Sequence, residues 1–120
     1  MVHLFNQMNL GAHAQQADMR RLRLGREFDA ILAWNSFFHM SHRDQASLFE
    51  VSRAHAAPRA FLVFSTGHKF GEGDGSPVCH ASFAPLQYRR MLRDAGFRVL
   101  RFFPEDDRLN RHNWWLCRRA

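Results

Sequence analysis

Two apolar runs of strand length stand out along the chain. They lie within the predicted strands Phe28–Trp34 and Ala60–Ser65. Continuous apolar runs of this length are typical of strands that are buried on both faces of a parallel sheet. Each strand is followed by polar residues, Asn35 and Ser36 after the first and Thr66 after the second. Because ligands of open α/β sheets bind beyond the carboxyl ends of the strands, we expect a functional site at these positions.

A helix is predicted between the two strands. Ser41 followed by Asp44 is the pattern of a helix N-terminus, and Pro58 marks the exit from the helix. We place this helix from Ser41 to about Ala56, with three residues facing the sheet: Leu48, Phe49 and Ser52. A strand, a helix and a second strand form a βαβ unit with parallel strands.

The C-terminal half is predicted to contain a helix followed by a strand pair. The helix Pro85–Ala95 has proline in its first turn and Gly96 just past its end. Its apolar face is predicted to contain Leu86, Met91, Leu92 and Ala95. The strands Arg98–Phe103 and Trp114–Arg118 are joined by a polar loop that is too short for a parallel crossover, so we expect them to be antiparallel. The two tryptophans that begin the second strand should point to opposite faces of the sheet.

Two further segments carry weaker patterns. Residues 1–11 are predicted as an amphipathic helix, with Leu4, Phe5 and Met8 on one side and Val2 beside them. A short strand is predicted at Ala12–Ala17. Residues 68–80 form a Gly-rich stretch that is longer than most connections between elements.

Length and composition indicate one globular domain. The chain has 120 residues, 46% of them hydrophobic, and twelve phenylalanines with which to build a core. The net charge is +6, but the arginines are spread along the chain, which favours a solvated surface over a nucleic-acid site. No stretch approaches the ~20 apolar residues that a membrane span needs. With only Cys79 and Cys117 a disulfide framework is not expected, and we predict a cytoplasmic protein.

Several stretches, taken in their order and spacing, resemble class I S-adenosylmethionine-dependent methyltransferases of the small-molecule type. The resemblance runs from about Ala12 to Arg119. The matching stretches are Gln16–Arg20, Phe28–His39, Phe61–Ser65, Tyr88–Phe97 with its Asp-Ala-Gly-Phe ending, and Trp115–Arg118.

The resemblance implies an α/β fold. The family's sheet has strand order 3-2-1-4-5-7-6, with the last strand antiparallel to the others. On this basis Ala12–Ala17 corresponds to strand three, Phe28–Trp34 to strand four, Ala60–Ser65 to strand five, and the C-terminal pair to strands six and seven. Residues 1–120 are then a single partial domain: a truncated Rossmann-like methyltransferase sheet that lacks the first βαβ unit and ends in an antiparallel strand pair.

The family binds its cofactor chiefly through a Gly-rich turn after strand one and an acidic residue at the end of strand two. Neither motif is in this sequence, and the Gly71–Gly75 cluster follows strand five, which is the wrong context. We therefore interpret the chain as the C-terminal part of a methyltransferase domain, from a truncated gene product, a shortened gene model or a split protein. We expect these residues on their own to bind S-adenosylmethionine weakly or not at all, which leaves open whether the chain is an enzyme.

The resemblance also assigns cofactor positions. Asp18 matches the acid that accepts from the adenine amino group, and Met19 matches the residue whose backbone N–H meets the ring. The alternative for Asp18 is a turn or capping carboxylate. Trp34 and Asn35 end strand four, where the methyl donor and acceptor would meet.

The candidate catalytic residues are Asn35 and His39. Many relatives have an acid at the position of Asn35, whose amide can hydrogen-bond a substrate but cannot act as a base. His39 can act as a general base because imidazole titrates near neutrality. The alternative for His39 is a histidine that caps the helix entry or packs on Phe38.

Candidate contacts to a small-molecule methyl acceptor are Phe38, His68 and His80. Phe38 would wall an apolar pocket, or is ordinary core. The two histidines bracket the Gly-rich loop, which is either a substrate lid or an exposed connector. Eight scattered histidines without a carboxylate cluster predict no metal site.

A second class of function is a non-enzymatic interaction module. Without strands one and two, strand four loses its neighbour, and an apolar unpaired edge favours pairing with another chain. A homodimer formed through that edge would bury it symmetrically. The third and weakest hypothesis is a basic nucleic-acid binder, whose binding would depend steeply on salt.

Overall fold

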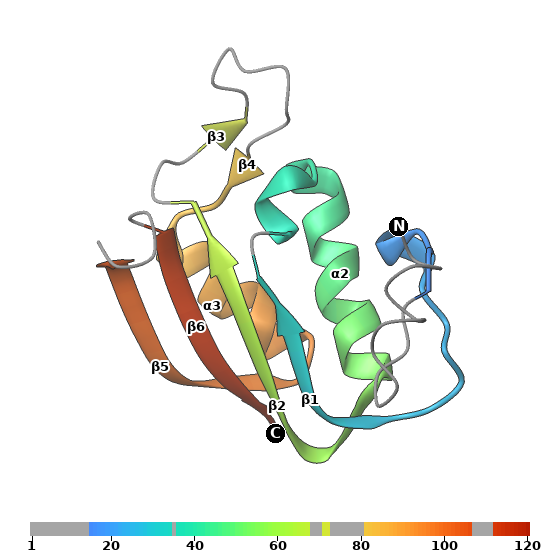
Figure 1. Ribbon diagram of the computed structural model, residues 1–120. Coiled ribbons are helices and arrows are strands. Elements are labelled where there is room, and N and C mark those ends of the chain that lie inside the picture. Colours follow the sequence, from blue (N-terminus) through green and yellow to red (C-terminus); the bar gives the residue numbers. More distant parts are fainter. Residues whose placement is uncertain (1–14, 35, 68–70, 73–80, 107–111) are drawn as a thin grey trace, which may run out of the picture.

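A four-stranded mixed sheet with two helices packed on one of its faces forms the body of the protein (Figure 1). The computed structural model describes residues 15–34, 36–67, 71–72, 81–106 and 112–120. The strand order is β1-β2-β6-β5. The strands are β1 (Phe28–Ala33), β2 (Ala56–Thr66), β5 (Phe97–Asp106) and β6 (His112–Arg119), and the helices are α2 (His42–Ala54) and α3 (Pro85–Asp94).

The predicted βαβ unit is confirmed. β1 and β2 are parallel and are connected by α2. Ser41 is the N-cap of α2, and its side chain accepts a hydrogen bond from the backbone N–H of Asp44. Leu48, Phe49 and Ser52 are buried on the side of α2 that faces the sheet, as predicted. The helix ends at Ala54, slightly before the predicted end.

β2 begins earlier than the sequence predicted, because a local distortion lets the strand include Pro58. Phe28 pairs with Ala56 and Ala30 pairs with Phe61, so Asp29 alone stands opposite residues 57–60. Arg59 has a φ of 66°, in the left-handed region. Pro58 therefore lies at an irregular part of the strand, where its missing N–H disturbs no regular ladder, and does not mark the helix exit.

The C-terminal half confirms the predicted antiparallel pair. β5 and β6 are antiparallel, and β6 is inserted between β5 and β2. The predicted apolar face of α3 is wrong in one residue, because Leu86 is 60% exposed and Tyr88 faces the core instead. At 100° per residue, Leu86 lies opposite the stripe formed by Tyr88 and Leu92.

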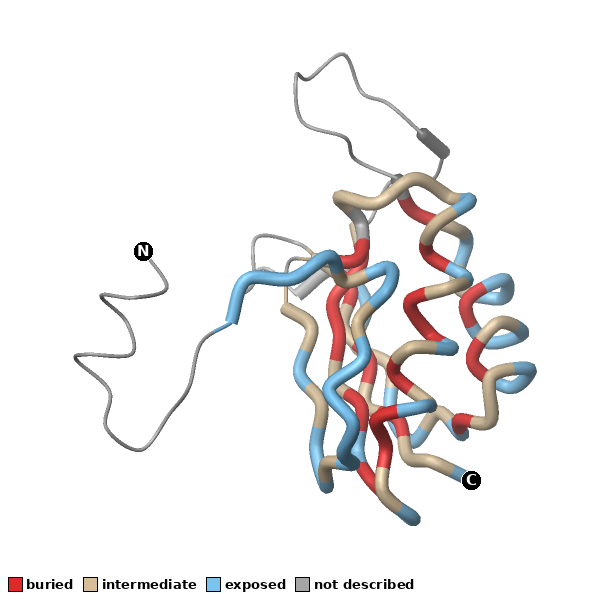
Figure 2. Tube along the Cα trace, turned by 90° about the vertical axis from the view of Figure 1, so that its right-hand side faces the viewer, coloured by how far each residue is buried: buried red, intermediate tan, exposed pale blue. Residues whose placement is uncertain are grey.

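The sheet has two unlike faces. Both helices pack on one of them, where Leu62, Phe64, Trp115 and Cys117 are all fully buried (Figures 1 and 2). We call this the covered face. Within the described residues no helix lies on the opposite face, which we call the bare face. Its apolar residues are Leu32, Phe61, Val63, Phe103, Trp114 and Leu116.

The expectation that the first strand is buried on both faces is wrong. β1 lies at one edge of the sheet, and Leu32 is 70% exposed on the bare face. The edge position itself agrees with the expectation that strand four has lost a neighbour. The two tryptophans point to opposite faces as predicted, with Trp115 in the core and Trp114 half-buried on the bare face.

The remaining segments are short. Of the predicted strand Ala12–Ala17 the structure describes residues 15–17, which are exposed and have no regular structure, because no described strand lies beyond β1 to pair with them. They lead into the 3₁₀-helix η1 (Met19–Arg21). The predicted helix at 1–11 lies outside the described residues. Within the Gly-rich stretch β3 (Gly71–Glu72) pairs with β4 (Ala81–Ser82), and the rest of that stretch is also outside them.

Candidate functional site

The candidate site lies where β1 ends and α2 begins. After Ala33 the chain turns through Trp34 into the 3₁₀-helix η2 (Phe37–His39). Ser36 Oγ donates a hydrogen bond of 2.8 Å to the carbonyl oxygen of Trp34, which closes the turn. The next side chain, Phe37, is buried, with its ring centre 5.4 Å from that of Phe49 and 5.5 Å from that of Phe64. The turn is thus held by a hydrogen bond on one side and by the core on the other.

The ring of Trp34 belongs to an aromatic cluster on the bare face. Its centre lies 6.4 Å from that of Trp114, at an interplanar angle of 58°. Trp114 is stacked on Phe103, with centres 3.7 Å apart and an angle of 6°. The indole N–H of Trp114 is buried without a hydrogen-bond partner. Ring contacts on the bare face therefore connect the residue after β1 to β6 and, through Trp114, to β5.

Asp18 takes the capping role that was weighed as its alternative. Its Oδ1 accepts from the backbone N–H of Arg20 at 3.0 Å, and its Oδ2 lies 2.8 Å from Arg20 Nη2. These hydrogen bonds lower the pKa of Asp18 from 3.8 to about 2. Arg20 also lies 3.6 Å from Asp44 in the first turn of α2, so these ion pairs tie η1 to the start of α2. Met19 packs against the core.

The other predicted site residues lie on or beside the same turn. His39 ends η2, is partly buried, and donates its backbone N–H to the carbonyl oxygen of Ser36 at 3.1 Å. Phe38 is part of η2, but its side chain is outside the described residues, as are Asn35, His68 and His80. Both η1, which begins at Met19, and η2, which ends at His39, contact α2.

A buried polar network between the helices was missed by the sequence analysis. Tyr88 of α3 donates its hydroxyl to Gln45 Oε1 of α2 at 2.7 Å, and Gln45 Nε2 donates to the carbonyl oxygen of Met40 at 3.0 Å. Both side chains are buried, and burial raises the pKa of Tyr88 to about 12. The sequence feature that could have indicated this network is Gln45, a polar residue on the same face of the helix as Leu48 and Phe49.

A second missed set of contacts lies at the ends of β2 and β4. Ser82 Oγ accepts the backbone N–H of Gly67 at 2.9 Å, while its carbonyl oxygen lies 3.0 Å from His42 Nε2. His42 also stacks on Phe83, with ring centres 4.0 Å apart. The contacts of His42 link the start of α2 to the segment that leads into α3, and they join partners about forty residues apart in the sequence.

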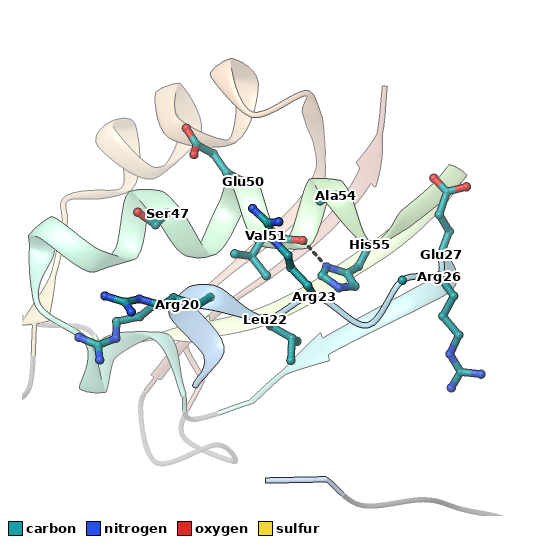
Figure 3. Close-up of a pocket in the computed structure, with 12 residues that line it drawn as sticks. Arg20, Leu22, Arg23, Arg26, Glu27, Ser47, Glu50, Val51, Ala54 and His55 are labelled. Carbon is teal, nitrogen blue, oxygen red and sulfur yellow. Dashed lines mark hydrogen bonds between the residues drawn. The ribbon is translucent and has the colours of Figure 1, made fainter. Parts of the chain in front are cut away.

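A groove runs between α2 and the segment that leads from η1 into β1 (Figure 3). Its volume is about 1020 Å³, and its charged lining residues are Arg20, Arg21, Arg23, Arg26, Glu27 and Glu50. His55, which also lines the groove, connects its two sides. Its Nε2 accepts the backbone N–H of Leu24 at 3.0 Å, and its Nδ1 lies 2.8 Å from the carbonyl oxygen of Val51 in α2. The sequence analysis did not single out His55.

In the described part of the chain, no three His, Cys, Asp or Glu side chains come together as a metal site requires. None of the described helices has the length and apolar character to span a bilayer.

No protein-family model and no curated protein matches the sequence. Solved structures do match. An S-adenosylmethionine-dependent methyltransferase from Clostridium acetobutylicum ATCC 824 aligns with 97% of this chain at a TM-score of 0.75 and 10% identity. The fold is that of part of a methyltransferase. SAM-bound CalS10, an amino pentose methyltransferase from Micromonospora echinaspora involved in calicheamicin biosynthesis, aligns with 98% of this chain at a TM-score of 0.75 and 14% identity.

A third match shows that the likeness covers only a portion of these enzymes. Magnesium protoporphyrin IX methyltransferase (ChlM) from Synechocystis PCC 6803, with bound SAM, aligns with 98% of this chain at a TM-score of 0.68 and 16% identity. The chain covers 68% of the Clostridium structure, 69% of CalS10 and 52% of ChlM. The observed strand order β1-β2-β6-β5 agrees with the 4-5-7-6 portion of the methyltransferase sheet.

Proposed function

We propose that this chain supplies the C-terminal part of the catalytic domain of an S-adenosylmethionine-dependent methyltransferase that acts on a small molecule. The observation that carries the proposal is the sheet, in which β6 lies between β2 and β5 and is antiparallel to both. The likeness to three methyltransferases, two of which hold SAM, supports it. The proposed site is at the carboxyl end of β1, where the turn at Trp34 and Ser36 is held in place.

In this proposal the cofactor lies against η1 and the end of β1. A carboxylate has about four acceptor positions, so Asp18 can hold Arg20 and still accept from an adenine amino group. Met19 would offer its backbone N–H to the ring, and Trp34 with Asn35 would border the methyl group. Phe38, His68 and His80 would contact the methyl acceptor.

The proposed chemistry asks for positioning and proton removal. A nucleophilic oxygen or nitrogen of the acceptor attacks the sulfonium methyl in line, so that its bond to carbon forms as the carbon–sulfur bond breaks. The acceptor's proton passes to a base, for which His39 at the end of η2 is the candidate. Asn35 would orient the acceptor by hydrogen bonding.

Calorimetric titration and NMR with S-adenosylhomocysteine test the cofactor part of the proposal. Because the Gly-rich turn and the second-strand acid are absent from the sequence, we expect affinity weaker than micromolar, with chemical-shift changes confined to η1, Trp34 and His39. Asp18→Asn should reduce these changes, while Asp94→Asn, at an exposed carboxylate on α3, should not. Micromolar affinity would overturn the expectation of weak binding, and shift changes elsewhere would overturn the proposed site.

The second candidate is an interaction module that forms a homodimer through the edge of β1. The observation that favours it is the edge position of β1 together with the 70% exposure of Leu32. Light scattering should then show a dimer that Leu32→Lys converts to monomer. Leu86→Lys, at a site 60% exposed on α3, should leave the dimer intact. A folded protein that is monomeric at all concentrations would exclude this candidate.

A further inference from the structure

The segment between η1 and β1, residues 22–27, has no regular secondary structure. We call it the strap. It borders three hollows: the groove of Figure 3, an apolar hollow of about 300 Å³, and a third hollow of about 790 Å³ near the start of β1. Leu24, in the middle of the strap, is exposed. The strap is therefore packed less tightly than the elements that it joins.

One side chain connects the strap to α2. His55 is the C-cap of α2, and only 7% of it is exposed. Figure 3 shows its ring between α2 and the strap. Because Nε2 accepts the backbone N–H of Leu24, the proton of the neutral ring is on Nδ1, which donates to the carbonyl oxygen of Val51. Only the neutral ring can make both hydrogen bonds.

Protonation of this ring would change one of the two contacts and keep the other. The added proton goes to Nε2, so this atom becomes a donor that faces the N–H donor of Leu24. Nδ1 still donates to Val51, and a positive charge is favourable at the C-terminal end of a helix. The ring therefore stays on α2 while the strap loses its hydrogen bond. Imidazole is the side chain that makes this change between about pH 5 and pH 8.

The charged groups around His55 are mostly arginines, whose charge does not change with pH in this range. The strap carries Glu27, which lies 3.4 Å from Arg119 of β6. Arg119 also donates to the carbonyl oxygen of Ala56, the residue after His55, at 2.6 Å. The other charged groups lining the groove beside His55 are Arg20 and Arg21 from η1, Arg23 and Arg26 from the strap, and Glu50 from α2. A protonated ring is repelled by the two arginines of the strap, which adds to the loss of the hydrogen bond.

The strap and His55 separate the groove from the apolar hollow. Leu22, Val51 and His55 line both of them, whereas Met19 and Ile31 line the hollow but not the groove. The described residues around the hollow include no Asp, Glu, Lys or Arg. Movement of the strap away from His55 would therefore open an apolar surface to the groove.

From these contacts we propose that His55 is a pH-sensitive switch for the strap. While the ring is neutral, it holds Leu24 against the end of α2 and keeps the apolar hollow separate from the groove. When the ring is protonated, the strap is released and the hollow opens towards the groove. The proposal concerns the strap and does not depend on the proposed methyltransferase function.

Solution NMR of the 120-residue chain between about pH 8 and about pH 5.5 tests the switch. At the upper pH the ring ¹⁵N signals of His55 should show the proton on Nδ1. As the ring takes up its second proton, the exchange protection of the Leu24 amide, corrected for the intrinsic effect of pH, should fall about two- to tenfold with the same midpoint. The amide of Leu92 in α3 should keep its protection. A proton on Nε2 at the upper pH, or a Leu24 protection that does not follow the ring, would overturn the proposal.

Four variants identify the group responsible. His55→Gln keeps an oxygen that can accept from Leu24 but takes up no proton in this range, so Leu24 protection should no longer depend on pH. His42→Gln, Glu27→Gln and Glu50→Gln should each retain the pH dependence of the native chain. Its loss in any of these three, or its persistence in His55→Gln, would assign the effect to another group and contradict the proposal.

Uptake of an apolar dye tests whether the hollow opens. Nile red fluorescence should rise on acidification of the native chain and stay constant in His55→Gln. The near-ultraviolet signal of the buried Trp115 should not change over the same range, because the strap alone moves. Absence of dye uptake would contradict the opening of the hollow. Loss of the Trp115 signal together with Leu24 protection would mean that the whole domain unfolds, which would exclude a local switch.

Discussion

The covered and bare faces of the sheet are built by alternate residues of the same strands, yet their surroundings differ. On the covered face Leu62, Phe64 and Trp115 are fully buried beneath α2 and α3. On the bare face Leu32 is 70% exposed and Phe61 is 37% exposed. The side chains of both faces are largely apolar. The comparison teaches that burial in this sheet is decided by which segments lie above a face, and not by the hydrophobicity of the strand.

The largest difference between the faces should appear at the two adjacent tryptophans. Trp115→Ala removes a ring that stacks on Phe64 and packs on Phe102, and should lower the free energy of unfolding by about 3–5 kcal/mol. Trp114→Ala loses the stacking on Phe103 and should cost about 1–2 kcal/mol. Urea denaturation measures both. Equal losses would mean that the bare face is packed as well as the covered one.

Two leucines on adjacent strands give the same comparison with one residue type. Leu62→Ala leaves a cavity in the core and should cost about 2–5 kcal/mol. Leu32→Ala should change stability by less than about 0.5 kcal/mol in the described arrangement, because most of its side chain is in solvent. Thermal unfolding of both variants checks this. A large loss at Leu32 would show that another segment, or another molecule, covers it.

Loss of the Tyr88–Gln45 hydrogen bond beneath the covered face should lower the free energy of unfolding by an intermediate amount. Tyr88→Phe removes the hydroxyl that donates to the buried Oε1 of Gln45, which should cost about 1–3 kcal/mol. Changing Gln45 to Leu in the Tyr88→Phe background should recover only part of the loss, because it removes the buried Oε1 but also removes the Nε2 donor to the Met40 carbonyl oxygen. A double-mutant cycle in urea isolates the pairwise contribution. Strictly additive losses would contradict the role given to this hydrogen bond.

The smallest effect is expected at Asp18, an exposed carboxylate that belongs to neither face. Its pKa is lowered to about 2 in the folded chain, so its contribution to stability is present above pH 3.8 and is lost as the pH falls through about 2. NMR titration of the carboxyl carbon should give this pKa. Arg20→Ala should return it towards 3.8, with little change in stability at neutral pH because the pair is exposed. An unchanged pKa in that variant would show that Arg20 is not its cause.

Two parts of the fold that local sequence determines were predicted correctly. α2 was located by its Ser41 cap, and the antiparallel β5–β6 pair by its short connection. The burial of β1 on both faces was predicted wrongly, because an apolar run does not reveal whether another segment packs on each face of the sheet. The face of α3 was misassigned at Leu86, although the 100° spacing of helical residues already places Leu86 opposite the buried stripe of Tyr88 and Leu92.

The candidate site shows the same division between local and distant contacts. The capping role of Asp18 depends on Arg20 two residues later and was one of the two alternatives drawn from the sequence. The contacts of His42 with Ser82, and of Trp115 with Thr66, join distant elements and leave no local pattern to recognise. Such contacts depend on which elements the fold brings side by side, and the sequence pattern did not predict which side chains would then meet.

The position of β6 in the sheet has a consequence for how the chain is made. β6 is the last described strand to be synthesised, yet it lies between β2 and β5, which are both made earlier. While it is still on the ribosome, the nascent βαβ unit therefore presents the unpaired edge of β2. Pairing of Leu62 with Cys117 closes that edge only once β6 has emerged, so completion of the sheet must be a late and non-local step. Until then the edge of β2, besides that of β1, is open to chaperones or to aggregation of the growing polypeptide.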